Sequence, residues 1–229
     1  MSVVAIIPAA GKGTRLKSEI HKPFYPLRGR PILSRTLDVF ENCGSVDHII
    51  VVISEDKVSW CSSEIVDAFG YKKVKKVVGG GEQRQDSVYN GLRAVSDGCD
   101  IVVIHDGVRP FVRVELIARS IELCQEHQAV IAAIPPKDTI KRGEAGFIIA
   151  TLDRSKLWMV QTPQTFSYDL IMKAYEKAYG DQFWGTDDAS LVERLGGKVK
   201  ILEGSYDNIK ITTQEDLYLA EKILVQRRG

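Results

Sequence analysis

The sequence predicts an α/β fold with a mostly parallel β-sheet and helices on both of its faces. Short β-branched runs recur along the chain, and several are apolar almost throughout, as strands covered on both faces of a sheet are. Stretches with helical periodicity separate these runs, which is the alternation expected of βαβ units. In such sheets ligands bind beyond the carboxyl ends of the strands, so the loops at those ends are the places to look for function.

Six runs are predicted to form the strands. The first is apolar at every position and leads directly into a loop rich in small residues, and the others are short and rich in valine and isoleucine. The predicted strands are Val3–Ile7, His48–Ser54, Val74–Val78, Asp100–His105, Ala129–Ile134 and Lys198–Leu202.

Four stretches have apolar residues at helical spacing. One of them places Val88, Leu92 and Val95 on a single face. The last helix follows Thr213, and the spacing from Thr213 to Asp216 is that of a capping box. The predicted helices are Ile32–Cys43, Gln83–Val95, Val114–Glu126 and Asp216–Arg227.

One stretch breaks the alternation. Lys137–Thr151 contains two short segments around a glycine-containing turn, which predicts a β-hairpin. Two prolines, Pro135 and Pro136, precede it and cannot continue a central strand. We therefore expect an arm at about 137–154. Because an isolated hairpin is only marginally stable, a second subunit is expected to cover its apolar residues. The candidates for the buried face are Ile140, Phe147, Ile148 and Ile149.

Composition and charge exclude several classes of protein. The chain has 229 residues, 44% of them hydrophobic and 27% charged, which is typical of a globular protein with a sizeable core. A formal net charge of +1 gives no overall attraction to nucleic acid or to an anionic membrane. No apolar run is long enough to span a bilayer, and we expect no signal peptide. The four cysteines are isolated in sequence, as reduced thiols of a cytoplasmic protein are.

The loop after the first predicted strand has the features of an anion-binding site. It contains Gly11 and Gly13, and two cations, Arg15 and Lys22, follow. A dinucleotide fingerprint would need a third small residue where Leu16 stands, and a Walker loop needs a different spacing. Unshielded backbone N–H groups beside two cations can hold an anion, and polyphosphate is the physical expectation.

Two further loops follow predicted strands. Three glycines, residues 79–81, precede a helix that contains Ser87, and they form either a flexible connection or a close approach of backbone to a ligand. Asp106 ends an apolar strand, where a carboxylate can hold Mg²⁺ against phosphates or serve as a turn or N-cap residue. We expect His105 to be structural. Asp187 and Asp188 are expected either to stand at a helix N-terminus or to help shape the site.

These stretches together resemble the 2-C-methyl-D-erythritol 4-phosphate cytidylyltransferases of isoprenoid-precursor synthesis. The resemblance runs from Val3 to about Leu217, and the ordered set of segments is more specific than any one of them. The matching segments are PAAGKGTR, HKPF, GGGEQRQDSV, HDGVRPF, RSKLWMVQTPQTF, TDDASLVE and NIKITTQEDL.

The resemblance implies one Rossmann-like nucleotidyltransferase domain over residues 1–229, a homodimer formed through the arm, and a need for CTP and Mg²⁺. It implies transfer of CMP to the phosphate of methylerythritol phosphate, a small polyol phosphate. The residues implied to contact CTP are Pro8, Ala9, Ala10, Gly11, Gly13, Gly81, Ser87, Asp106, Gly107 and Arg109. Arg15 and Lys22 would stabilise the transition state, with Asp106 as the metal ligand. Arg154 from the partner's arm, with Lys210 and Thr162, would bind the acceptor phosphate.

Three alternatives stay open. A ribitol-5-phosphate cytidylyltransferase would share the CTP motifs and differ at the acceptor pocket. An NAD-dependent oxidoreductase is disfavoured by Leu16 at the third glycine position. A non-catalytic nucleotide-binding protein would not need Arg15, Lys22, Asp106 and Lys210 together.

Overall fold

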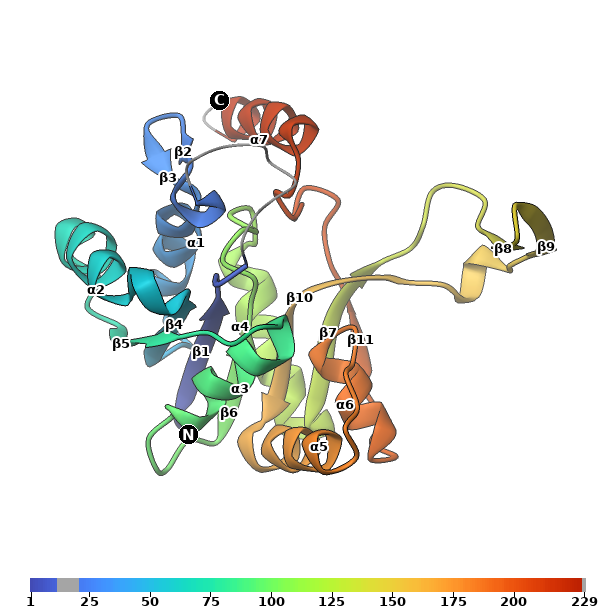
Figure 1. The fold of residues 1–229 in the computed structure, drawn as a ribbon, viewed down its shortest axis with the longest axis horizontal. Coiled ribbons are helices and arrows are strands. Elements are labelled where there is room, and N and C mark those ends of the chain that lie inside the picture. Colours follow the sequence, from blue (N-terminus) through green and yellow to red (C-terminus); the bar gives the residue numbers. More distant parts are fainter. Residues whose placement is uncertain (12–20, 228–229) are drawn as a thin grey trace.

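The fold is centred on a seven-stranded sheet with strand order β11-β7-β10-β6-β1-β4-β5 (Figure 1). The computed structural model describes residues 1–11 and 21–227. All neighbouring strands run parallel except β10, which lies antiparallel between β6 and β7. The strands of this sheet are β1 (Val3–Pro8), β4 (His48–Ile53), β5 (Val74–Gly79), β6 (Ile101–Ile104), β7 (Ala129–Ile134), β10 (Met159–Ser167) and β11 (Lys200–Glu203).

Helices cover both faces of the sheet. The helices are α1 (Ile32–Glu41), α2 (Val58–Cys61), α3 (Arg84–Arg93), α4 (Val114–His127), α5 (Tyr168–Gly180), α6 (Asp188–Arg194) and α7 (Gln214–Gln226). In β1, alternate side chains serve opposite cores: Ala5 packs with α1, α2 and α4, whereas Ile6 packs with α3, α5 and α6. This alternation explains why the strand is apolar at every position.

All six predicted strands and the mostly parallel sheet are confirmed, but one central strand lies outside the predicted set. That strand, β10, is rich in glutamine and threonine and contains Pro163, which suggests a loop. The proline lies in an irregularity where the register with β7 shifts, a position where proline is tolerated in a sheet. The polar side chains are buried because distant residues bond them: the hydroxyls of Thr165 and Ser120, for example, are 2.8 Å apart.

The helix predictions are confirmed with small differences at the ends. Three helices, α2, α5 and α6, lie outside the four predicted ranges, although a helix N-terminus was expected where α6 begins. Helix α5 buries Ile171, Ala174, Tyr175 and Ala178, a helical spacing that the sequence itself displays. The capping box at Thr213 is present at the start of α7. Helix α7 packs in a third apolar cluster with Leu27, Val108 and Phe111, next to short strands β2 (Pro26–Leu27) and β3 (Arg30–Pro31).

The predicted hairpin is present and projects away from the body (Figure 1). Its strands, β8 (Lys141–Glu144) and β9 (Phe147–Thr151), pair antiparallel in a separate two-stranded sheet. Phe147 is 78% exposed and Ile148 is 69% exposed. These apolar side chains therefore have no cover from the body of the chain. No helix among residues 1–11 and 21–227 is long and apolar enough to cross a membrane.

Candidate active site

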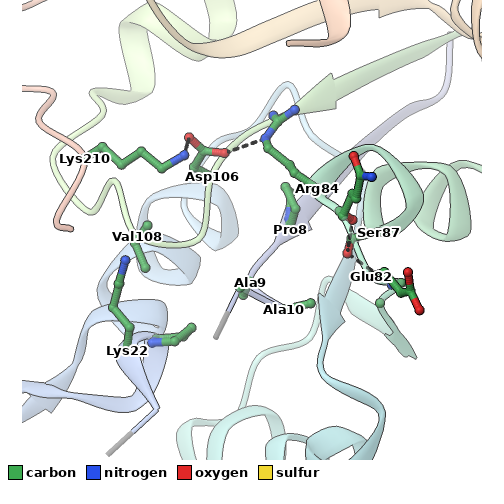
Figure 2. A pocket seen from close by; sticks show the side chains of 15 residues that line it. Pro8, Ala9, Ala10, Lys22, Glu82, Arg84, Ser87, Asp106, Val108 and Lys210 are labelled. Atoms are coloured by element: carbon green, nitrogen blue, oxygen red, sulfur yellow. Dashed lines mark hydrogen bonds and ion pairs between the residues drawn. The ribbon is translucent and has the colours of Figure 1, made fainter. Parts of the chain in front are cut away.

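A cavity of about 590 Å³ opens at the carboxyl ends of the parallel strands (Figure 2). Its wall combines the loop after β1, the glycine loop after β5 and charged side chains from distant parts of the chain. The lining residues are Pro8, Ala9, Ala10, Gly11, Lys22, Pro23, Gly80, Gly81, Glu82, Gln83, Arg84, Ser87, Asp106, Val108 and Lys210. The sequence prediction that function lies beyond these strand ends agrees with this placement.

The glycine loop packs too closely to accept side chains. A Cβ at Gly80 would lie 2.4 Å from the Cβ of Ala10, and one at Gly81 would lie 2.3 Å from the Cβ of Asp86. The Ser87 hydroxyl accepts a hydrogen bond from the Gly81 N–H and donates to the Gln83 carbonyl. Ser87 thus joins the loop to the first turn of α3, and backbone forms this wall of the cavity.

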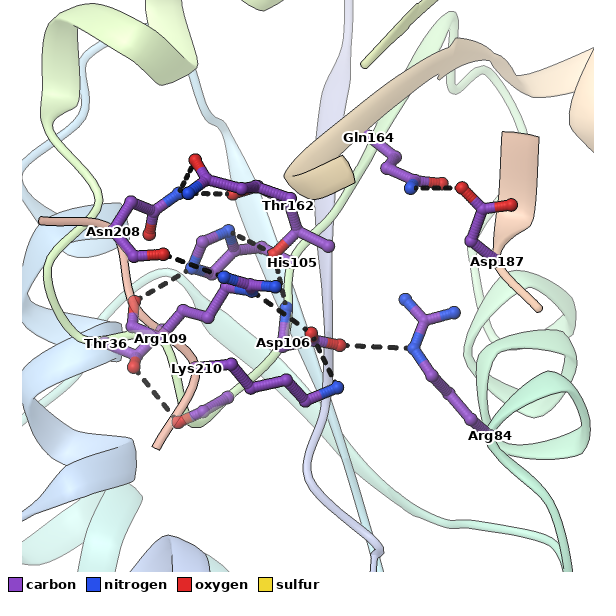
Figure 3. A network of polar contacts seen from close by, with 12 residues as sticks. Thr36, Arg84, His105, Asp106, Arg109, Thr162, Gln164, Asp187, Asn208 and Lys210 are labelled. Atoms are coloured by element: carbon purple, nitrogen blue, oxygen red, sulfur yellow. Dashed lines mark hydrogen bonds and ion pairs between the residues drawn. The ribbon is translucent and has the colours of Figure 1, made fainter. Parts of the chain in front are cut away.

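Asp106 is the electrostatic centre of the site (Figure 3). Its carboxylate lies 3.1 Å from Arg84 Nε, 3.0 Å from Lys210 Nζ and 3.4 Å from Arg109 Nε. Burial alone would raise the pKa of Asp106, but the three positive charges hold the pKa well below its ordinary value. The carboxylate is therefore ionised, and it gathers three cations at one edge of the sheet.

Buried hydrogen bonds hold the backbone of Asp106. Burial lowers the pKa of the neighbouring His105 to about 4, so the ring is neutral near pH 7. His105 Nε2 lies 3.0 Å from the Arg109 carbonyl, which can only accept, so Nε2 carries the proton. Nδ1 then accepts from the Thr162 hydroxyl, and the Thr162 oxygen accepts from the Asp106 N–H. The expectation that His105 is structural is confirmed.

A second cavity of about 420 Å³ adjoins the first. Arg84, Asp106 and Lys210 line both cavities and form their shared wall. The remaining lining residues are Arg109, Ile131, Val160, Gln161, Thr162, Gln164, Thr186, Asp187, Ser190 and Glu193. Two cavities that share a wall with two cations can bring two anionic ligands into contact.

Most of the predicted site residues lie together in these cavities. Arg109 and Thr162 line the second cavity, and Lys210 lines both. Gly107 follows Asp106, and its N–H donates to the Pro8 carbonyl. The predictions for Gly13 and Arg15 concern residues outside the described part of the chain.

Arg154 lines neither cavity. It lies in the short 3₁₀ helix η5 (Arg154–Lys156) at the return of the arm, and it is exposed. Its guanidinium donates to the Lys137 carbonyl at 2.6 Å. Its predicted role in a partner's site stays a prediction.

The sequence interpretation missed Arg84 and left a site role for Asp187 and Asp188 open. Arg84 begins α3, shortly after the glycine loop, so a cation close to the three glycines was the available signal. Asp187 is the N-cap of α6, as expected, and its other carboxylate oxygen accepts from Gln164 at 2.8 Å. Gln164 lies in β10, which was not among the predicted strands, so no local sequence pattern predicts its contact with Asp187.

Asp106 is also the residue that could hold a metal. Among residues 1–11 and 21–227, no cluster of three or more histidine, cysteine, aspartate or glutamate side chains is arranged around a metal position. Three cations already surround the Asp106 carboxylate. A divalent cation fits this wall if phosphate oxygens supply most of its ligands, which is how Mg²⁺ is usually bound.

Comparison with known proteins identifies the family. Residues 3–226 match the IspD family model, which describes 2-C-methyl-D-erythritol 4-phosphate cytidylyltransferase. The chain belongs to this family. It is 50% identical over 226 residues to the 2-C-methyl-D-erythritol 4-phosphate cytidylyltransferase of Geotalea uraniireducens, covering 98% of this chain and 97% of the relative. The Clostridioides difficile protein of the same name is 45% identical over 219 residues, covering 96% of this chain and 92% of the relative.

Solved structures of cytidylyltransferases share the fold. The 4-diphosphocytidyl-2C-methyl-D-erythritol synthase of Anaerococcus prevotii superposes with a TM-score of 0.87 at 36% identity, covering 98% of this chain and 96% of that one. The Thermus thermophilus enzyme, 2-C-methyl-D-erythritol 4-phosphate cytidylyltransferase, gives 0.77 at 32% identity, covering 97% and 98%. The mostly parallel sheet is thus the cytidylyltransferase fold.

Proposed function

We propose that this chain transfers CMP from CTP to 2-C-methyl-D-erythritol 4-phosphate, which gives 4-diphosphocytidyl-2-C-methyl-D-erythritol and pyrophosphate. This is a step of the non-mevalonate route to isoprenoid precursors. The observation that carries the proposal is the pair of adjoining cavities with Arg84, Asp106 and Lys210 in their common wall. One cavity has a glycine-lined wall, which suits a nucleoside triphosphate. The other is lined largely by polar side chains, which suits a small polar acceptor.

The reaction needs charge neutralisation rather than a nucleophilic side chain. An oxygen of the acceptor phosphate attacks the α-phosphorus of CTP, a new P–O bond forms, and the bond to the β-phosphate oxygen breaks. Pyrophosphate leaves with that electron pair. Because both reactants are anions, cations and backbone donors that hold them in line supply most of the catalysis. Lys22 and Arg15 are proposed to act at the α-phosphate, and Lys210 at the acceptor phosphate.

The proposed cofactor is Mg²⁺ or another divalent cation. The metal would neutralise the triphosphate and polarise the phosphorus that is attacked. Asp106 would approach it from the shared wall, while Arg84, Arg109 and Lys210 keep the carboxylate ionised.

The proposed assembly is a homodimer in the cytoplasm, in which each arm reaches the other subunit. Exposed Phe147 and Ile148 support this proposal, because a large apolar surface on a thin hairpin is costly in water. Arg154 would then enter the partner's site and contact the acceptor phosphate.

The test is turnover of CTP labelled at the α-phosphate, with release of pyrophosphate as a second readout. Labelled cytidylyl product should form with methylerythritol phosphate and Mg²⁺ and should be absent without the acceptor. Ribitol 5-phosphate serves as the competing acceptor. Faster turnover with ribitol phosphate would move the assignment to that related activity, and no turnover with either would contradict a transferase.

A further inference from the structure

A buried carboxylate behind the active-site wall has no role in the reaction described so far. Asp188 is the first residue of α6 and is only 1% exposed. Its Oδ1 accepts from Arg84 Nη1 at 3.1 Å, and its Oδ2 accepts from Arg84 Nη2 at 2.8 Å. The Tyr175 hydroxyl donates to Oδ1 at 2.6 Å from helix α5. Asp188 is therefore held by the Tyr175 hydroxyl on one side and accepts two hydrogen bonds from Arg84 on the other.

The same guanidinium reaches the active-site carboxylate. Arg84 Nε donates to Asp106 Oδ1 at 3.1 Å, so one side chain bridges Asp188 and Asp106. Arg84 lines both cavities, whereas Asp188 lines neither. A continuous row of polar contacts thus runs from Tyr175 through Asp188 and Arg84 to Asp106.

This geometry restricts Arg84 strongly. A planar guanidinium that makes two parallel bonds to one carboxylate has a defined orientation, which a single point contact would not give. Arginine otherwise has several rotatable bonds and loses rotamer freedom when it is fixed. Asp188 therefore turns a flexible side chain into a rigid part of the wall before any ligand arrives.

We propose that Asp188, oriented by the Tyr175 hydroxyl, is a positioning residue for cytidylyl transfer: it fixes Arg84 between the two cavities and, through Arg84, the carboxylate of Asp106. This inference rests on the proposed function. It assigns Asp188 no contact with substrate. Its effect reaches the reactants through Arg84 alone, and this property makes it testable.

The informative change is Asp188→Asn, which keeps the side-chain shape and removes the charge. The amide can no longer accept from both guanidinium nitrogens, so Arg84 loses its fixed orientation. Misplacement of a catalytic group by about 1 Å can cost roughly 10²-fold in rate, and we expect a loss of kcat of that order with a smaller change in the KM for CTP. Asp188→Glu restores the charge but adds a methylene to a buried site, so its kcat should lie between those of the wild type and Asp188→Asn.

Two tyrosines of α5 provide a milder and matched comparison. Tyr175→Phe removes only the hydroxyl that orients Asp188 and should lower kcat in the same direction. Tyr168→Phe removes a hydroxyl of the same helix that donates to the Leu92 carbonyl, outside both cavities. The Tyr168→Phe protein should keep its kcat. Thermal unfolding and near-ultraviolet circular dichroism would show that each variant is folded.

A double-mutant cycle tests whether Asp188 acts through Arg84. In an Arg84→Ala background, Asp188→Asn should cause no further loss of kcat, because the side chain it positions is gone. Independent, multiplicative losses would overturn the inference, as would full activity of Asp188→Asn. If Asp188→Asn does not fold, the comparison of Tyr175→Phe with Tyr168→Phe decides, and equal kcat values for the two would reject the role.

Failure of this inference is separable from failure of the proposed function. A wild-type protein that does not transfer CMP contradicts the proposed function itself. A wild-type protein that transfers CMP while Asp188→Asn matches it contradicts only the positioning role.

Discussion

The charged wall of the active site and the hairpin arm differ in how completely one chain builds them. The wall draws Asp106, Arg84 and Lys210 from separate elements, and each has an ionic partner within the same chain. The arm is local: β8 pairs only with β9, and Phe147 remains 78% exposed. The wall is thus assembled by packing within one chain, whereas the arm leaves its apolar side chains exposed to solvent.

This contrast indicates which site residues one subunit supplies by itself and which a second subunit could supply. Groups in the wall are fixed by mutual attraction inside a low-dielectric site, so they are in place before substrate binds. Within the described part of the chain, the side chain of Arg154 at the end of the arm bonds only to the Lys137 carbonyl, near the base of the same hairpin. Four experiments would sharpen or break this contrast.

The largest effect is expected for Asp106→Asn in the wall. Removing this charge leaves three cations without their common anion and deletes the proposed metal ligand, so kcat should fall by more than roughly 10³-fold. The fold should survive, which circular dichroism would check. Titration with Mg²⁺ tests the metal role: normal turnover of the variant at ordinary Mg²⁺ concentrations would show that Asp106 does not hold the metal.

Lys22→Ala and Arg15→Ala should each lower kcat more than they weaken CTP binding. Loss of one preorganised charge donor typically costs roughly 10²–10³ in rate. Steady-state kinetics with varied CTP would measure both constants. An increase of KM with unchanged kcat would mean that these cations bind substrate and transition state equally, contrary to the proposal.

Substitutions in the arm should change the dimer dissociation constant rather than the stability of the folded subunit. Phe147→Asp should weaken dimerisation, because burial of a phenylalanine is worth about 1.5–3 kcal/mol, which corresponds to roughly 10- to 100-fold in the dissociation constant. Analytical ultracentrifugation across a dilution series would measure this. Glu144→Gln, on the other strand of the arm, is a control that leaves the apolar face intact. A monomeric wild-type protein would refute the covered-arm proposal.

The smallest expected signal is a recovery of activity on mixing. Lys22→Ala and Arg154→Ala proteins are each expected to be inactive, but their heterodimer would hold one site with both defects and one with neither. Up to about half of the wild-type activity per heterodimer should return, because a two-fold interface exchanges the arms symmetrically. If subunit exchange is demonstrated and no activity returns, Arg154 acts in its own subunit or not at all.

Residues with a local signal were predictable. The glycine loop before α3, the carboxylate that follows β6 and the hairpin turn all follow from short stretches of sequence. Arg84 had such a signal too, beside the glycine loop, but a single arginine on a helix start has many possible roles. Strand β10 had none, because its Gln161, Thr162 and Gln164 are buried only by virtue of partners elsewhere in the chain.

By itself, the sequence determined the alternation of strands and helices, the mostly parallel sheet, the loops that carry the site and the family to which the chain belongs. These follow from local periodicity, from glycine and proline chemistry and from the order of the motifs. Only the tertiary structure decided that three cations surround Asp106 and that two cavities share a wall. It also decided that Asp188 binds Arg84, which lies 104 positions away in the sequence. Those contacts depend on how distant elements pack, and no local pattern of residues contains that information.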